Sequence, residues 1–459
     1  MKRFWISALF LFLLTSFVST SRLFAQAPAP SATPTNPWLD QLKSPDEKTR
    51  GKAARELGKS NDAAVIPALA AALTDPSDKV RREVVIALAQ IHQPESLDGL
   101  ITAAKDSDPD VRVAAAQSLV GYYTGVVPSP GFTGYVKKQW RRAKSHFVQD
   151  NSRIDPGLKV EPKVIAALDN AMLDTGSIQA AREAAKGLGI LVAPTVVPDL
   201  VKSAHSSDED LARESLNALA KIKEKSAGTQ LIDLLDSPDK DVRRDACVTL
   251  GVLRTKDALP KLQSMFENDP DLKTKEKALE GLAYLGEPAS VPVFTKSLWS
   301  DNKQMRISAA DGLARAGDPK NVAEIEKRLA VENDASTKLA LQFAITALGK
   351  DDHLAAIAAE LSSKFRGEDA QTYLIELSRD KKFLPKLYPY LSSQDAGVRR
   401  RLCTVLMFTG DQSSMEHLER VSHDPNGEVA SEALRAMRAI RVRAPASAPV
   451  PAPASNPTP

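Results

Sequence analysis

The feature that most constrains the fold is a helical hairpin pattern that recurs about every 31 residues along most of the chain. In residues 75–106, a first apolar stripe follows the spacing i, i+4, i+7, i+8, i+11, and a second stripe of the same kind follows a break at residues 92–96. Each stripe is typical of one face of an amphipathic helix. A hairpin this small cannot bury two apolar faces alone, so the pattern predicts that the hairpins stack on one another.

One apolar residue, nearly always leucine, ends the first stripe of each unit and marks the repeat. The markers are Leu57, Leu88, Leu119, Leu188, Leu219, Leu250, Leu282, Leu313, Leu348, Leu377, Leu406 and Met437. Successive markers lie 29 to 35 residues apart, except for one step of 69 residues between the third and the fourth. This spacing predicts an all-α fold, an α-solenoid or superhelix of about twelve helical hairpins with one insertion.

Glycine, proline and acidic residues predict where the helices begin and end. Gly286 and Gly317 each stand two residues before a proline, which predicts a helix end followed by a helix start. Aspartate and serine in the loops before first helices predict N-caps. Glycines just past a marker predict the end of a first helix. These glycines are Gly58, Gly189, Gly251 and Gly349.

Several first helices contain the pattern D-x-x-V-R-x-x-A-x-x-A-L, as in residues 107–119 and 239–250. Over residues 45–443 these units resemble short HEAT-like repeats of the type also seen in phycobilisome lyases. The resemblance implies a solenoid but says little about activity, because such repeats serve many partners. It also implies that the basic residue of the pattern braces neighbouring units by pairing with a loop aspartate, such as Asp75 or Asp106, rather than binding a ligand. The bracing positions are Arg50, Arg81, Arg112, Arg243, Lys275, Arg306 and Arg399.

The N-terminal residues predict export. Lys2 and Arg3 precede an apolar run over residues 4–18, and an A-x-A pattern follows at residues 25–27. A membrane span needs about 20 apolar residues, so this arrangement is typical of a cleavable secretory signal over residues 1–27, cut after Ala25 or Ala27. We therefore expect a periplasmic or secreted protein, with an uncleaved membrane anchor as the alternative.

Two Pro/Ala-rich segments flank the repeats. Residues 28–36 form a linker and residues 444–459 a tail, and both compositions are typical of extended, disordered spacers. Residues 37–443 between them form the solenoid. Asn36 and Pro37 predict the start of an unpaired helix that covers the first repeat. The last helix, residues 428–443, carries four arginines, which predicts a solvent-facing cap.

The sequence contains no motif of a known catalytic or cofactor site. A Gly-rich phosphate loop, G-x-S-x-G, H-E-x-x-H and C-x-x-C are all absent. Deoxyhypusine hydroxylase, an iron enzyme built on this type of repeat, uses His-Glu pairs, but no histidine precedes a glutamate here. Cys247 and Cys403 occupy the same apolar position of distant repeats, which predicts two buried free thiols. We expect no cofactor, no metal and no enzymatic activity.

The insertion, residues 122–160, differs from the rest of the chain in composition. It holds six aromatic residues and, with seven basic and two acidic residues, a local charge of +5. Residues 134–147 follow a helical apolar spacing with basic residues on the other sides, which predicts a short basic amphipathic helix. Insertions in repeat arrays often map to the binding face. The candidate partner-binding residues are Tyr122, Tyr123, Tyr135, Lys137, Lys138, Trp140, Arg141, Arg142, Lys144 and Phe147.

These observations predict an exported, non-enzymatic scaffold that binds one or more unidentified proteins, because Tyr, Trp and Arg are enriched in binding hot spots. One alternative is attachment to anionic lipid or a wall polymer of the envelope through the basic helix, which salt would weaken. A second alternative is a lyase-like enzyme or enzyme subunit without a recognisable motif. Loss of the signal removes three basic residues and lowers the net charge from +3 to 0, so nucleic acid is not expected as a partner.

Overall fold

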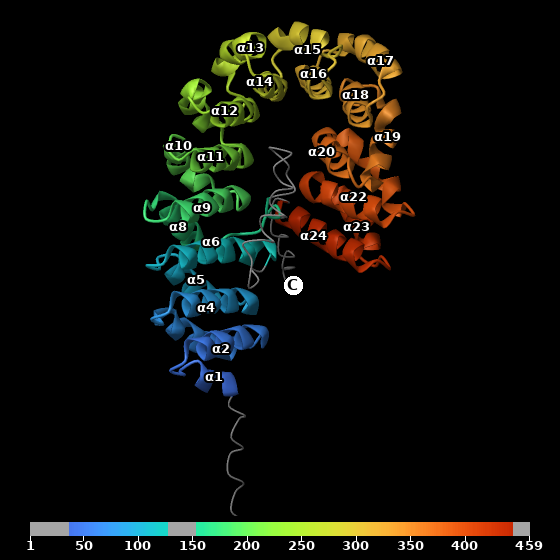
Figure 1. Ribbon diagram of the computed structural model, residues 1–459. Helices are drawn as coiled ribbons and strands as arrows, with labels where there is room; N and C mark the ends of the chain where they lie inside the picture. Colours follow the sequence, from blue (N-terminus) through green and yellow to red (C-terminus); the bar gives the residue numbers. More distant parts are fainter. Residues whose placement is uncertain (1–35, 127–152, 444–459) are drawn as a thin grey trace, which may run out of the picture.

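The computed structural model describes residues 36–126 and 153–443, and they form paired helices stacked into a strongly curved arch (Figure 1). The first helix of each pair lies on the inner side of the arch and the second on the outer side. Within the described residues all regular structure is α-helix or 3-10 helix. Twelve first helices follow one another along the arch. The prediction of an all-α solenoid of about twelve hairpins is confirmed.

The helices on the inner side are the longer ones. They are α2 (Glu47–Lys59), α4 (Asp78–Ile91), α6 (Pro109–Thr124), α9 (Ile178–Ile190), α11 (Glu209–Ile222), α12 (Lys240–Val252), α14 (Leu272–Leu285), α16 (Lys303–Ala316), α18 (Ala335–Ala347), α20 (Gly367–Leu377), α22 (Ala396–Thr409) and α24 (Gly427–Arg443). Neighbouring members of this series pack against each other, which buries the stripes recognised in the sequence.

The second helices are shorter, and several begin or end in a 3-10 turn. They are α3 (Ile66–Ala71), α5 (Ser96–Ala103), α8 (Pro162–Leu173), α10 (Val197–Ala204), α13 (Leu259–Asn268), α15 (Val291–Ser297), α17 (Val322–Val331), α19 (Leu354–Ala359), α21 (Leu384–Leu387) and α23 (Met415–Val421). Between α11 and α12 the 3-10 segment η6 (Lys225–Asp236) takes this place. One continuous apolar core runs through the arch from Leu42 to Ile440.

Helix starts follow the predicted caps. The short helix α1 (Pro37–Gln41) begins after Asn36, whose side chain accepts the backbone N–H of Trp38. In most first helices an aspartate accepts one or two N–H groups of the first turn, as Asp108 does in α6 and Asp271 in α14. These bonds satisfy donors that a helix leaves unpaired at its N-terminus. Cys247 and Cys403 are buried and free, as predicted.

Most first helices end in a residue with a left-handed backbone, four positions after the marker. Glycine, which adopts this conformation at no steric cost, fills the position at Gly286, Gly317 and Gly349, and each of the three ends a helix as predicted. The other residues at this position are Asn61, His92, Val192, Lys223 and Arg254. At five of these helix ends a residue with a side chain therefore adopts the less favourable left-handed conformation.

The prediction that Gly58, Gly189 and Gly251 end helices is wrong, because all three lie inside helices. They lie where neighbouring first helices approach most closely. A Cβ atom added to Gly189 would lie 2.6 Å from the Cα of Ala218 in α11. These glycines therefore set the distance between helices rather than a turn.

The ninth marker is wrong by three residues. In the other first helices the marker follows the N-cap residue by eleven positions, and the same offset from Asp334, the N-cap of α18, gives the fully buried Ile345 instead of Leu348. The steps from Leu313 and to Leu377 then become 32 residues each, in place of 35 and 29. Because α18 is apolar on most sides, Leu348 also fits the apolar spacing of the repeat, although it lies three residues after the marker position.

Only the two ends of the insertion lie within the described residues. At its start, Tyr122, Tyr123 and Thr124 belong to the last turn of α6. At its end, residues 153–161, here called the connection, run along the inner side of the arch and lead into α8 (Figure 1). The predicted amphipathic helix at residues 134–147 lies outside the described residues. In the two described ranges, no helix combines the length and apolar character needed to cross a membrane.

Candidate functional site

A cleft of about 860 Å³ lies on the inner side of the arch, where the third repeat meets the last helix. Its wall is formed by Tyr122 and Tyr123 of α6 and by His92, the left-handed residue that follows α4. The connection and Arg435 of α24 complete the cleft. We call this site the aromatic cleft.

The aromatic side chains of the cleft are in contact with each other. The rings of His92 and Tyr122 stack with their centroids 4.7 Å apart, and Tyr123 meets Tyr122 edge-on at 5.1 Å. The hydroxyl of Tyr123 accepts the backbone N–H of Glu161 at 3.0 Å, and burial raises the pKa of this phenol. Tyr123 therefore fixes the connection against α6, while Tyr122 contributes a ring face to the cleft.

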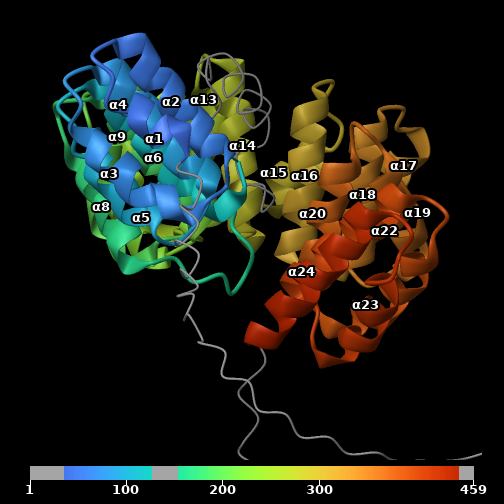
Figure 2. The same ribbon diagram turned by 90° about the horizontal axis from the view of Figure 1, so that it is seen from below.

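The opposite wall depends on contact between distant parts of the chain. Arg435 donates from Nε to Oδ2 of Asp155 at 3.0 Å and makes a second contact through Nη2 and Oδ1, and it also binds Glu432. The hydrogen bonds hold the pKa of Arg435 above its ordinary value. A Cβ atom added to Gly157 would lie 2.7 Å from Val442, so the connection packs directly on α24. Figure 2 shows α24 directed towards the opposite limb of the arch.

The last helix agrees only in part with the predicted solvent-facing cap, because Arg438 and Arg441 are exposed whereas the other two arginines bind distant parts of the chain. Arg435 binds Asp155, and Arg443 donates to the backbone oxygens of Met407 and Gly410. The solenoid curves enough to bring α24 back to the third repeat. The periodicity of the sequence contains no information on this curvature.

The structure places two of the ten candidate partner-binding residues, Tyr122 and Tyr123, in the aromatic cleft. The other eight lie outside the described residues: Tyr135, Lys137, Lys138, Trp140, Arg141, Arg142, Lys144 and Phe147. Val126 and Arg153, which flank residues 127–152, both line the cleft, so the insertion leaves and rejoins the solenoid there. Sequence reasoning missed His92, Asp155 and Arg435, because only the folded chain brings them together.

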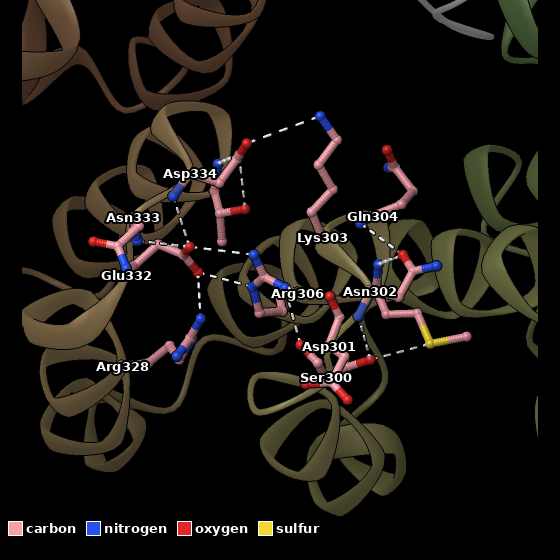
Figure 3. Close-up of polar contacts among 12 residues, drawn as sticks. Ser300, Asp301, Asn302, Lys303, Gln304, Arg306, Arg328, Glu332, Asn333 and Asp334 are labelled. Atoms are coloured by element: carbon pink, nitrogen blue, oxygen red, sulfur yellow. Dashed lines mark hydrogen bonds and ion pairs between the residues drawn. The ribbon is translucent and has the colours of Figure 1, made fainter.

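The bracing residue Arg306 shows how neighbouring repeats are joined at the loops between hairpins, here called the rim of the arch (Figure 3). Its Nε and Nη2 bind Glu332 at 2.8 and 3.2 Å, and its Nη1 donates to the backbone oxygens of Ser300 and Asp301. Glu332 is 4% exposed and also accepts from Arg328. Although burial opposes ionisation, these donors lower the pKa of Glu332 to about 2. One arginine thus ties a loop of its own repeat to a loop of the next.

Three other bracing arginines bind an aspartate of the next loop through two nitrogens each. These pairs are Arg50 with Asp75, Arg81 with Asp106, and Arg399 with Asp424. The remaining bracing positions bind mainly backbone oxygens: Arg112 those of Asp106, Ser107 and Gly176, Arg243 those of Ser237 and Pro238, and Lys275 that of Glu267. Apart from the bond to Glu267 in the last turn of α13, these contacts are made to the loops that join one hairpin to the next.

A second network lies on the inner side of the arch, at its bend. Arg315 of α16 binds Glu376 of α20 through Nε at 2.8 Å and Nη2 at 2.9 Å, although α18 separates these helices in the chain. Tyr373 donates to Asp311 at 2.9 Å, and the guanidinium of Arg315 lies 4.6 Å from the ring centre of Tyr284. Sequence reasoning missed this network, because its partners are about 60 residues apart.

The chemistry of this inner network follows from its burial. The side chain of Arg315 is only 7% exposed. Burial raises the pKa of Asp311 to about 7, whereas the guanidinium of Arg315 keeps the pKa of Glu376 below its ordinary value. The network is held together by ion pairing and hydrogen bonding. Among the described residues, no group of three or more His, Cys, Asp or Glu side chains is arranged to hold a metal ion.

Comparison with known proteins identifies the repeats. A family model described as HEAT repeats matches residues 35–120, 165–251, 197–282, 228–311 and 259–346. These overlapping stretches cover more than half of the chain, so the protein belongs to the HEAT-repeat family. The interval between the first two stretches contains the insertion.

The chain is also similar to a solved structure, the crystal structure of an engineered protein from the Northeast Structural Genomics Consortium. The two are 19% identical with a TM-score of 0.34, and the comparison covers 88% of this chain and 98% of that one. No curated protein matches the chain.

Proposed function

We propose that this protein is an exported HEAT-repeat scaffold that binds a protein partner at the aromatic cleft. HEAT repeats typically serve as scaffolds for protein interactions, and stacked hairpins offer an extended inner surface. The observation that carries the proposal is the convergence of Tyr122, His92 and Arg435 on one cleft beside both ends of the basic, aromatic insertion.

The chemistry of the cleft favours a protein partner. Tyrosine and arginine dominate binding hot spots, because they combine large contact area with directed hydrogen bonds. Tyr122 extends from a helix whose base is packed in the core, so its position is set before binding. The insertion, whose two described ends line the cleft, carries basic residues at 137–144, and this charge favours a partner with an acidic rim.

Export belongs to the same proposal and rests on residues 1–27. The expected product of signal cleavage starts after Ala25 or Ala27. The mass of the protein recovered from the envelope or medium tests this: a chain that retains Met1 would contradict a cleavable signal.

The binding site is tested by affinity capture from an envelope extract, read by mass spectrometry. The baits are residues 28–459 unchanged, Tyr122→Ala, and a quintuple alanine variant at Lys137, Lys138, Trp140, Arg141 and Arg142. Trp299→Ala is the matched control, because Trp299 is a half-exposed aromatic residue that follows α15, one of the second helices. Circular dichroism checks that all baits are equally helical.

A partner bound by the unchanged and control baits, and reduced at least tenfold on Tyr122→Ala, would support the cleft. Equal capture by all four baits would move the site elsewhere on the solenoid. Association with anionic vesicles that salt abolishes, without any captured protein, would favour the envelope-attachment alternative instead.

A further inference from the structure

The described chain ends beside the aromatic cleft. Val442, one residue before the end of α24, packs on Gly157, and Gly157 lies between two residues that line the cleft, Asp155 and Leu158. Arg443 is fixed by its bonds to Met407 and Gly410, so the direction in which the chain leaves α24 is set. The segment 444–459 therefore follows a helix end that packs on the connection, next to residues that line the cleft.

The sequence of this tail suits an aromatic surface. It reads APASAPVPAPASNPTP, with a proline at six of sixteen positions and no charged side chain. Such segments favour the polyproline II conformation even when free, so they lose little conformational entropy on binding. They bind grooves in which aromatic rings pack against proline rings and a hydroxyl or amide donor reaches a backbone carbonyl.

The aromatic cleft offers these features together. The stacked rings of His92 and Tyr122 form an aromatic wall, and Leu158, which is 46% exposed, extends it as an apolar surface. The hydroxyl of Tyr122 can donate to a carbonyl of a proline-rich segment. An uncharged segment would also leave the ion pair of Arg435 with Asp155 undisturbed.

We propose that the proline-rich tail, residues 444–459, binds in the aromatic cleft of its own chain and must be displaced by any partner that uses the cleft. Because the tail is tethered beside the cleft, its effective concentration there is on the order of millimolar, so even a weak contact is populated. About 3.1 Å of rise per residue lets the first six residues span roughly 20 Å. The inference uses the cleft of the proposed function but requires no external partner.

Photo-crosslinking in the full mature chain tests this occupant directly. Tyr122→p-benzoylphenylalanine places the probe in the cleft, and Trp299→p-benzoylphenylalanine is the control at a distant aromatic position. A third variant, Leu158→p-benzoylphenylalanine, keeps the test valid if replacing Tyr122 perturbs the cleft. We expect products of monomer mass in which residue 122 or 158, and not 299, is joined to residues 444–459.

Replacing the six tail prolines with serine at constant length should lower this crosslinking several-fold. The proposal is overturned if the cleft probes react only with other segments such as residues 127–152, if the products have the mass of a dimer, or if proline replacement changes nothing. Because no partner is present, a failed capture experiment leaves this result unaffected, and the reverse also holds.

Discussion

The lower arm of the arch, from α2 to α12, and its bend, from α14 to α20, are built from the same hairpin but joined differently. In the arm, charged contacts such as that of Arg81 with Asp106 lie at the rim and span 25 positions, one repeat. The bend keeps a rim contact in Arg306 with Glu332, and adds the inner pair of Arg315 with Glu376, which spans 61 positions. Rim contacts therefore join neighbouring repeats, whereas the inner pair joins helices that lie two repeats apart in the chain.

Replacing Arg315, the cation of the bend, should cause the largest loss of stability. Arg315→Ala leaves Asp311 and Glu376 buried without their partner, and breaking a buried pair costs about 3–5 kcal/mol. Arg81→Ala in the arm leaves a single carboxylate, Asp106, without its partner; this group keeps the backbone N–H of Asp108, so a smaller loss of about 1–3 kcal/mol is expected. Thermal unfolding with hydrogen exchange of α16 and α20 measures both. Equal losses would show that the bend has no special role.

The pH dependence of stability should also separate the bend from the arm. The pKa of Asp311 is about 7 in the folded chain and 3.8 in its ordinary state, so between about pH 4 and 7 the folded state holds a proton that the unfolded chain has lost. The free energy of unfolding contributed by this group therefore falls as the pH rises through that window.

Asp311→Asn cannot ionise and should remove this slope. Melting temperatures at pH 5, 6 and 7.5 should show the unchanged protein losing stability relative to the variant as the pH rises. The lowered pKa of Glu376 acts in the opposite direction, but only at lower pH, near and below its ordinary value of 4.5. Parallel profiles of the two proteins would contradict the buried state of Asp311.

The first helices α12 and α14, where the arm meets the bend, pack with their backbones in close contact, so a side chain placed between them should lower stability. A side chain at Gly251 would overlap the backbone of Gly281 in α14, which has no flexible group to move aside. Gly251→Ala should therefore destabilise the protein by about 1–3 kcal/mol. Gly427→Ala, at a helical glycine with nothing within 4 Å, is the control and should be neutral or slightly stabilising. A neutral Gly251→Ala would mean that the arm tolerates wider spacing.

The contact between the connection and the last helix should give the smallest change in stability. Arg435 and Asp155 are partly exposed, so Asp155→Asn should cost less than about 1 kcal/mol. The same change should raise hydrogen exchange in residues 153–161 and increase the radius of gyration in solution scattering. Asp98→Asn, which removes an exposed pair with Lys163, is the control. Unchanged scattering would show that the packing of Val442 on Gly157 is sufficient for closure.

Local sequence information predicted what depends on a single repeat and its neighbours. The apolar stripes, the N-caps and the buried cysteines follow from spacing and residue type, and each lies where expected. The errors arise because one residue type has different roles at different positions of the repeat. Gly58, next to a marker, lies where two helices approach closely, whereas Gly286, four residues after a marker, ends a helix. Leu348 and Ile345 are both apolar, and only the N-cap at Asp334 shows that Ile345 occupies the marker position.

The candidate site could be predicted only in part, for a physical reason. Tyr122 and Tyr123 were recognised because the insertion departs from the repeat pattern. His92, Asp155 and Arg435 belong to the site through curvature, a property accumulated over many small rotations between repeats. No local pattern indicates that partners two repeats apart, such as Arg315 and Glu376, will meet.

The contact of Asp155 with Arg435 makes the two ends of the solenoid differ in how well they are supported. In an open stack of repeats, both terminal units lack one neighbour and fray first. Here α24 rests on the connection, so the described chain has only one unsupported end, at α1 and α2. Progressive unfolding should therefore start at the N-terminal hairpins, and the last repeats should come apart only after the third repeat has released them.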